Sequence, residues 1–166
     1  LDNAFYKEYI GLAEESGSEF LISYGRLMID AANLRSTVRA LRMKKDPQFM
    51  KRVLAEGGSV ETGRIILAMQ NREPVSGVFT GELKAAALLG DEVSESGELT
   101  TFEKACDDAL TERMSEIKYI GFGAEVLIAF LCNLENELLD VSIIMSGKLT
   151  GASNDTIRRR IRALDN

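Results

Sequence analysis

The chain offers few residues that could do chemistry, and the missing residue types exclude whole classes of enzyme. Its 166 residues include no histidine, so a Ser-His-Asp triad, a Cys-His pair and most zinc sites are impossible. Cys106 and Cys132 are the two cysteines, too few for a disulfide scaffold or a four-cysteine metal site. We expect both to be buried free thiols on apolar helix faces, in a reducing, cytoplasmic compartment.

The glycine and carboxylate patterns that remain are weak. Gly121-Phe122-Gly123 lacks the third glycine and the preceding strand of a dinucleotide site, and Gly147-Lys148 lacks the upstream glycine of a P-loop. Neighbouring carboxylates such as Asp107 and Asp108 are usually solvated surface groups. We therefore predict no catalytic residue, no metal and no cofactor. A small-molecule enzyme would need a deep polar pocket with a perturbed carboxylate, for instance between repeated units.

The charge balance and the first residue of the chain carry further information. Lys and Arg total 20 against 26 Asp and Glu, a net charge of −6, which argues against a nucleic-acid partner. No signal peptide or membrane-spanning segment is visible. The chain begins at Leu1 directly inside a helical pattern, so we expect a fragment that lacks an N-terminal part.

Helical periodicity dominates the chain and predicts an all-α fold. Two prolines interrupt it, and no segment shows the two-residue alternation of a strand. We expect two long helices, over residues 18–45 and 124–149, each with apolar residues spaced four and three apart as in a heptad seam. The two stripes are Phe20, Tyr24, Leu27, Ala31, Leu34 and Val38, and Leu127, Leu131, Leu134, Leu138, Val141 and Met145.

Several residues predict where helices begin and end. Asp46-Pro47 suits a helix start, because Asp caps well and Pro fits the first turn. We expect Ser59 to cap a helix and Thr100 to Glu103 to form a capping box. Gly90 is expected to end a helix over residues 77–89.

The strongest structural signal is an internal repeat. Adding 107 to the residue numbers carries the whole first stripe onto the second and Lys51-Arg52 onto Arg158-Arg159. Because the helix breaks and basic residues coincide as well as the apolar residues, we interpret the pattern as a duplication. It predicts two similar helical units, over residues 1–99 and 100–166, each with one long heptad-striped helix.

Basic residues gather at matching places in both units although the chain is acidic. Residues 35–52 hold seven basic residues against one acid, and the last helix adds four arginines. Cations near a helix C-terminus can offset the helix dipole. A row beside the apolar stripe can also bind carboxylates, either on a partner or within the chain, such as Asp30. The candidate partner-binding residues are Arg35, Arg39, Arg42, Arg158, Arg159 and Arg162.

Two ordered segments resemble the C subunit of V/A-type rotary ATPases, the central-stalk subunit whose eukaryotic counterpart is known as the d subunit. The first runs from Asn33-Leu34-Arg35 through Arg52-Val53-Leu54 to Ala55-Glu56-Gly57-Gly58. The second runs from Glu135-Asn136-Glu137 through Ser146-Gly147-Lys148-Leu149-Thr150-Gly151 to Ile157-Arg158-Arg159-Arg160-Ile161. The resemblance implies three similar units in a pseudo-threefold funnel, of which this chain holds two and lacks the N-terminal third. The chain departs from the family at Asp140-Val141-Ser142, where an Asn-apolar-basic step is usual.

The resemblance implies a non-catalytic structural subunit. A subunit of this kind lies at the cytoplasmic face of the membrane, peripheral to it, on the rotor ring. It receives the central shaft, the D and F subunits, and transmits torque for proton or sodium transport coupled to ATP synthesis or hydrolysis. The implied partners are these ATPase subunits. A helical adaptor or scaffold unrelated to rotary motors would explain the same stripes and charges, and stays open as the alternative.

Overall fold

The structure, a computed structural model, describes residues 2–121 and 123–161. Every regular element of these residues is helical, which confirms the all-α class. Three short 3₁₀ helices are η1 (Val75–Gly77), η2 (Gly81–Leu83) and η3 (Glu116–Tyr119). The α-helices are α1 (Asp2–Ser16), α2 (Glu19–Arg42), α3 (Pro47–Met50), α4 (Thr62–Asn71), α5 (Lys84–Val93), α6 (Thr100–Ser115), α7 (Ala124–Leu149) and α8 (Asn154–Arg158).

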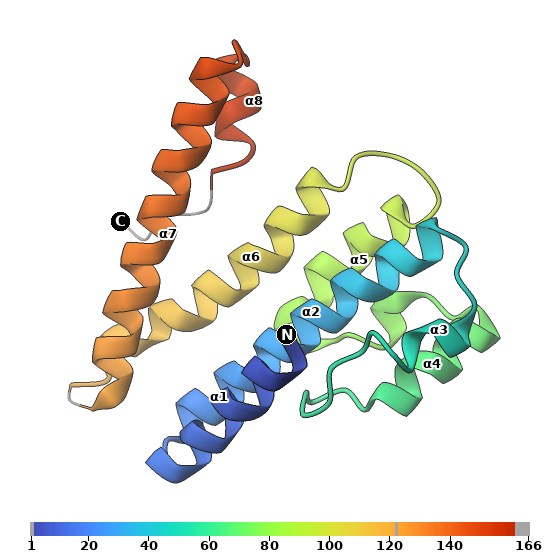
Figure 1. The fold of residues 1–166 in the computed structure, drawn as a ribbon, viewed down its shortest axis with the longest axis horizontal. Coiled ribbons are helices and arrows are strands. Elements are labelled where there is room, and N and C mark those ends of the chain that lie inside the picture. The colour runs from blue at the N-terminus through green and yellow to red at the C-terminus, as the bar shows by residue number, and fades with distance from the viewer. Residues whose placement is uncertain (1, 122, 162–166) are drawn as a thin grey trace.

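The long helices α2 and α7 form the two arms of a V (Figure 1). α1 packs along α2 as a helical hairpin, and α5 and α6 also pack against α2. The main core lies here, where Leu34, Val38 and Phe102 are fully buried. α7 turns back after α6 and diverges from α2, with α8 beside its far end (Figure 1). Near its start, Ala129 joins a small cluster with Tyr24 of α2.

The predicted start of α3 is confirmed, and α2 ends earlier than expected. The Asp46 side chain accepts from the N–H of Gln48 at 2.7 Å, and Pro47 is the first helical residue. α2 ends at Arg42 because Lys44 adopts a left-handed backbone with φ of 50°, which an α-helix cannot continue.

The expectation that Gly90 ends a helix is wrong. η1 covers residues 75–77, η2 covers residues 81–83 and α5 begins at Lys84, so Gly90 lies inside α5. A Cβ at Gly90 would lie 2.9 Å from Cγ2 of Val38 and 3.2 Å from the Phe102 ring. Glycine is therefore needed here for the close approach of α5 to α2 and α6, and not as a stop.

Two expected helix caps are also wrong. α6 begins at Thr100 without a side-chain cap, and Glu103 forms ion pairs with two arginines of α2. Ser59 precedes the start of α4 by three residues, and its N–H donates to Asp30 at 2.9 Å. In both cases the residue that the local pattern predicts as part of a helix cap makes a tertiary contact instead.

Two buried polar side chains of α2 fix the loop that follows α3. The Asn33 amide donates to the carbonyl of Ala55 at 2.9 Å and accepts from its N–H at 2.8 Å. Asp30, one turn earlier, accepts from the N–H groups of Ser59 and Val60. The loop is thereby held along α2 by main-chain hydrogen bonds that need no particular loop side chain.

The backbone pattern that ends α2 recurs at the end of α7. In each case two N–H groups beyond the helix donate to carbonyls of its last turn, at positions 107 residues apart. The donors are Lys44, Lys45, Gly151 and Ala152, and their acceptors are Leu41, Ala40, Lys148 and Gly147.

Each pattern leads into a short helix with a side-chain N-cap, Asp46 for α3 and Ser153 for α8. Each short helix buries one apolar residue against the long helix region, Met50 and Ile157. Residues 40–54 and 147–161 therefore share one local structure.

Replacing Asn33 by Asp should destabilise the fold although the two side chains have the same shape. The carboxylate still accepts from the Ala55 N–H, but it cannot donate to the Ala55 carbonyl and sets a negative charge against that oxygen. We expect the free energy of unfolding in urea to fall by about 2–4 kcal/mol. Asn133→Asp, the same change at an exposed position of α7, should cost less than about 0.5 kcal/mol. Equal losses in the two variants would contradict the proposed role of Asn33.

Candidate functional site

The first two candidate arginines connect α2 to α6. Arg35 pairs with Asp107 at 2.5 Å and, through Nε, with Glu103 at 3.1 Å. Arg39 pairs with the same Glu103 at 2.8 Å. The Arg35 side chain is 20% exposed and that of Arg39 is 55% exposed, so the Arg35 pairs are the better shielded from water.

Arg42 completes the row and contacts main chain rather than carboxylates. Its guanidinium donates to the carbonyls of Val93 at 3.2 Å and Gly97 at 2.7 Å. The sequence left open whether this row binds acids of the chain or of a partner, with Asp30 as one internal candidate. The structure shows internal acceptors on α6, at the last residue of α5 and in the loop between these helices, and Asp30 is not among them.

The candidate residues of the last helix lie elsewhere, at the far end of α7. Arg158 ends α8, Arg159 follows it, and both are exposed. Within the described ranges neither forms an ion pair, although Arg159 Nε donates to the Asp155 carbonyl at 3.4 Å. Arg162 lies outside the described residues. The structure thus separates the other five candidates into a row that holds α6 and a pair in solvent.

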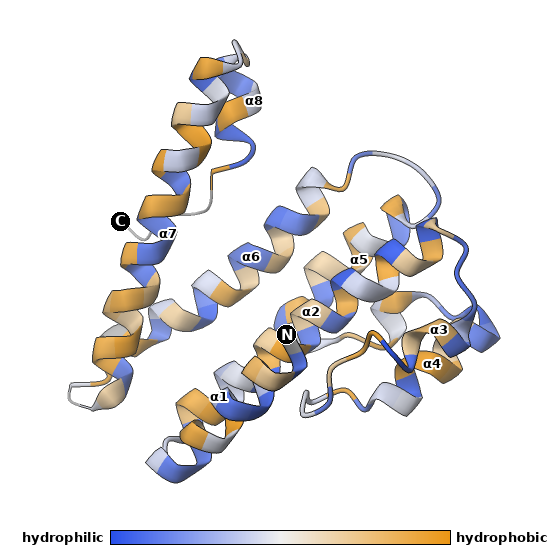
Figure 2. Cartoon of the chain, viewed as in Figure 1, coloured by the Kyte–Doolittle hydropathy of each residue, from blue (hydrophilic) through white to orange (hydrophobic). Residues whose placement is uncertain are grey.

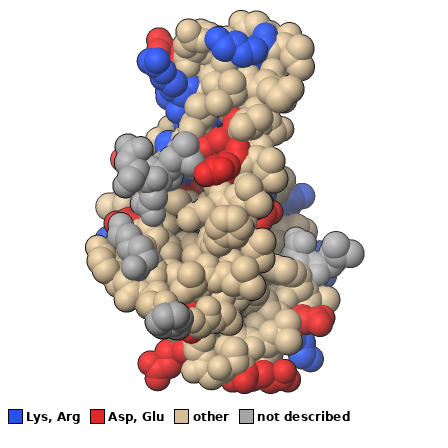
Figure 3. All heavy atoms as spheres, turned by 90° about the vertical axis from the view of Figure 1, so that its left-hand side faces the viewer, with Lys and Arg blue, Asp and Glu red and all other residues tan. Residues whose placement is uncertain are grey.

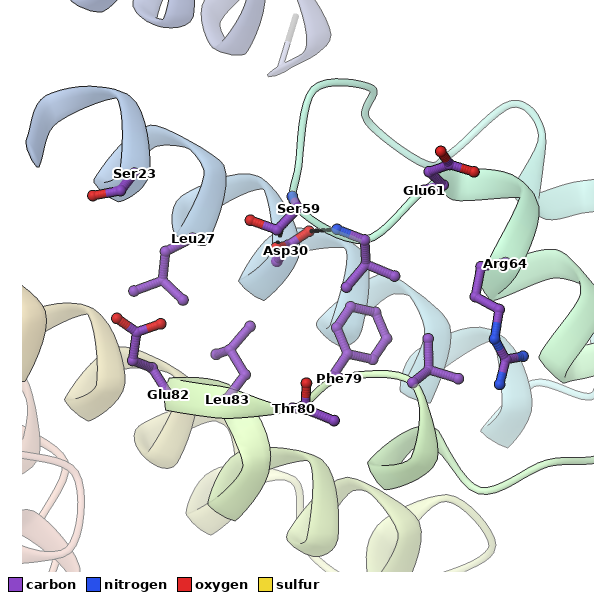
Figure 4. Close-up of a pocket in the computed structure, with 12 residues that line it drawn as sticks. Ser23, Leu27, Asp30, Ser59, Glu61, Arg64, Phe79, Thr80, Glu82 and Leu83 are labelled. Carbon is purple, nitrogen blue, oxygen red and sulfur yellow. Dashed lines mark hydrogen bonds between the residues drawn. The ribbon is translucent and has the colours of Figure 1, made fainter. Parts of the chain in front are cut away.

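A hollow of about 680 Å³ opens beside α2 (Figure 4). Its wall combines Asp30 with residues from the start of α4 and from the η1–η2 segment. Glu61 and Glu82 lie on opposite sides of the opening, so the carboxylates do not converge on one point (Figure 4). The hollow lies among residues 23–83, not between the two expected units.

Asp30 is the buried carboxylate of this hollow, and its surroundings explain its role. Burial raises the pKa of Asp30, while hydrogen bonds from the Val60 and Ser59 N–H groups lower it. Each carboxylate oxygen accepts one of these N–H groups, at 3.1 and 2.9 Å. A Cβ at Gly58 would lie 2.2 Å from Asp30 Oδ1, so the loop passes close above the carboxylate. Asp30 is a tether for this loop, because both of its carboxylate oxygens accept loop N–H groups.

The two cysteines are free and poorly reactive. Cys106 is fully buried, and burial raises the pKa of its thiol to about 12. Cys132 is half-buried, and burial also raises the pKa of its thiol. Because the thiolate is the nucleophile, a raised pKa lowers the fraction of each thiol that is in the reactive form at neutral pH. The expectation of buried free thiols is confirmed for Cys106, while Cys132 is only partly covered.

The apolar stripe of α7 lies in solvent, which corrects the expectation that it packs as a seam. Its six side chains are 44–63% exposed, whereas the α2 stripe is buried from Tyr24 onward. Figure 2 shows the apolar residues along α7, and Figure 3, viewed from that side, shows few charged groups on its face. The cause is coverage: α5 and α6 pack on α2, and no described helix packs on the same face of α7. Phe130 and Ile144 extend the exposed apolar face beyond the stripe.

The described residues thus form a helical body with an uncovered apolar face on α7, and they assemble no reactive site. The ATP synthase (C/AC39) subunit family matches residues 1–160 of the chain. The chain belongs to this family. The resemblance seen in the sequence to the C subunit of V/A-type ATPases is thereby confirmed.

A relative within this group is the C subunit of a V-type sodium ATPase from Enterococcus hirae, which is 24% identical to the chain over 162 residues. The match covers 97% of the chain and 49% of the relative, so the chain spans about half of that protein's length. No solved structure matches the chain. Among the described residues, no helix has the length and apolarity needed to cross a membrane.

Truncating Arg35 should destabilise this protein more than truncating Arg39. Arg35 bridges two carboxylates in a half-buried position, and its loss leaves Glu103 and Asp107 close together. We expect Arg35→Ala to lower the free energy of unfolding by about 1–3 kcal/mol and Arg39→Ala by less than about 1 kcal/mol. Arg26→Ala, at an exposed position on the same helix, serves as the control. An Arg35 loss as small as the Arg26 loss would show that the row does not hold α6.

Proposed function

We propose that the chain is part of a central-stalk subunit that links the shaft of a V-type ATPase, the D and F subunits, to its membrane rotor ring. In this role the subunit is peripheral to the membrane at its cytoplasmic face and transmits torque between ATP turnover and proton or sodium transport. It performs no catalysis itself. Membership of the C/AC39 family and the similarity to the C subunit of a V-type sodium ATPase support the proposal.

The helical build suits a part that must transmit force. α2 has 24 residues and α7 has 26, which gives rods of about 36 and 39 Å at 1.5 Å per residue. The ion pairs of Arg35 and Arg39 connect α2 to α6, and the hydrogen bonds of Asn33 connect it to the loop that follows α3. These contacts lie at several positions along α2. Twisting one end of this body therefore moves the other, because α2 runs between them as one continuous helix.

The observation that carries the proposal is the uncovered apolar face of α7. Soluble monomers rarely expose a continuous apolar patch larger than a few hundred Å². On α7 the exposed large apolar side chains follow the helix from its first turn to its last. A face of this length is suited to continuous packing against other helices of an assembly.

We further propose that the parts of the subunit form a pseudo-threefold funnel in which another helical unit covers α7. The stripe of α2 is covered by α5 of the first unit and α6 of the second, and it has the same spacing as the stripe of α7. The Enterococcus hirae relative is about twice as long as the matched region, which leaves room for such a unit. The division into units at residues 1–99 and 100–166 belongs to the same proposal.

The combined change Leu131→Glu and Leu138→Glu tests the proposal in two contexts. In the 166-residue chain both side chains are more than half exposed, so the thermal midpoint should change by less than about 3 °C. In the full-length protein the two charges fall within a buried contact, so recovery with shaft and ring subunits from detergent extracts should drop at least about tenfold.

Asn133→Glu is the matched control, since it adds a charge to the polar flank of the same helix. It should leave recovery unchanged in the full-length protein. If the tagged wild-type protein recovered neither shaft nor ring, the rotor role would be wrong and a helical adaptor would be favoured. If it recovered both and the double variant did the same, the α7 face would have no part in assembly.

A further inference from the structure

Two exposed pairs of cations lie at matching positions of the repeat. Lys51 and Arg52 follow α3, and Arg158 and Arg159 lie at the end of α8, 107 residues later. All four side chains are exposed. Because the preceding helix end, cap and buried apolar residue also correspond, each pair projects from the same local structure.

The chain's own acids do not explain these cations. Of the described residues, none forms an ion pair with any member of the two pairs, whereas Arg35 and Arg39 of α2, Arg64 of α4 and Arg113 of α6 each have a carboxylate partner. The chain has 26 acidic residues, so carboxylates are not scarce. Arg52 lies over the ring of Phe49 at 5.7 Å, which holds its guanidinium at the surface.

The helix dipole explains them poorly as well. α3 has four residues and α8 has five, little more than one turn each. So few aligned peptide units give only a small dipole at the helix end. The helix dipole therefore does not explain why exposed cations occur at the same place in both units.

Lys44 provides independent support at the same end of α2. It adopts a left-handed backbone with φ of 50°, and its counterpart Gly151 has φ of 72°. Glycine is the residue that adopts this conformation without strain. The first unit therefore has an exposed lysine in a strained backbone conformation where the second unit has glycine. This indicates that the ammonium group at this position contributes to binding.

The two pairs lie at the diverging ends of the V formed by α2 and α7 (Figure 1). Figure 3 shows Lys and Arg side chains around the end that carries α8 and acidic side chains along the opposite end. Exposed acids of that opposite end include Glu14, Glu15 and Glu19, where α1 meets α2. The cations of α8 and the acids at the turn between α1 and α2 thus lie at opposite ends of the face that Figure 3 shows.

We propose that Lys51-Arg52 and Arg158-Arg159 are two copies of one contact, which binds an acidic protein surface where the same carboxylate recurs by symmetry. This inference rests on the proposed function, in which the rotor ring of identical subunits is such a surface. Arginine recognises carboxylates through paired hydrogen bonds, so a fixed guanidinium at matching positions suits a repeated carboxylate. A lipid surface presents mobile headgroups and would not require two cation pairs at matching positions, which is why a protein partner is favoured.

Charge reversal of each pair in the full-length protein tests the inference. Lys51→Glu with Arg52→Glu, and Arg158→Glu with Arg159→Glu, are each compared with Lys7→Glu plus Arg26→Glu, an equal charge change at exposed positions of α1 and α2. Binding is measured to detergent-solubilised rotor ring, to purified shaft D–F subunits, and to phosphatidylglycerol vesicles. Circular dichroism should show unchanged helicity, because the reversed side chains are exposed.

Each pair reversal should weaken ring binding about tenfold and reduce its dependence on salt, with shaft binding and the control variant unchanged. Wild-type binding to ring and shaft with no loss in either reversal would overturn this inference and leave the proposed function standing. A loss in only one reversal would contradict the repeated contact. Wild-type binding to the vesicles that both reversals abolish, with ring binding unaffected, would assign the cations to lipid. Failure of the wild type to bind ring and shaft would instead overturn the proposed function.

Discussion

A long amphipathic helix is stable only where a neighbour covers its apolar face, and the two long helices here differ in that one respect. Leu34 and Val38 of α2 are fully buried under α5 and α6, while their counterparts Val141 and Met145 on α7 are 52% and 59% exposed. Burying one such side chain is worth about 1.5–3 kcal/mol. The apolar face of α2 is therefore covered within this chain, and the described residues leave that of α7 exposed.

This difference explains where the chain is held and where it is open. α7 is tied to the body near its start, where Ala129 and Cys132 meet Tyr24, and α8 packs on α7 itself near its end. Polar tethers concentrate on α2, through Asp30, Asn33 and Arg35. A body with one projecting arm is suited to join a larger assembly, and the chain belongs to the ATP synthase (C/AC39) subunit family.

Local signals in the sequence predicted the helices well and tertiary contacts poorly. Helical periodicity and Asp46-Pro47 placed the long helices and the start of α3 because these depend on neighbouring residues. Glu103 and Gly90 were assigned wrongly, because an ion pair and a close helix approach decide their roles. Periodicity also shows that a helix face is apolar without showing what covers it, which is why the α7 stripe was expected to be packed.

The candidate site shows the same limit. The arginine row from Arg35 to Arg42 could be recognised, but its acceptors lie on α6, at the end of α5 and in the loop between them, far away in sequence. Asn33 and Asp140 occupy matching buried positions, yet one carries an amide and the other a carboxylate. The two units therefore cannot form the same pair of side-chain hydrogen bonds there, because a carboxylate cannot donate. The repeat thus predicts shared backbone structure better than shared side-chain contacts.

Hydroxyl-radical footprinting of Leu131, Leu138 and Met145 tests the central claim most directly, because it reports the exposure of these side chains in any assembly. Oxidation should be fast in the 166-residue chain and several-fold slower in the full-length protein assembled with its ATPase partners. Equal oxidation rates in the two samples would mean that the α7 face stays in solvent.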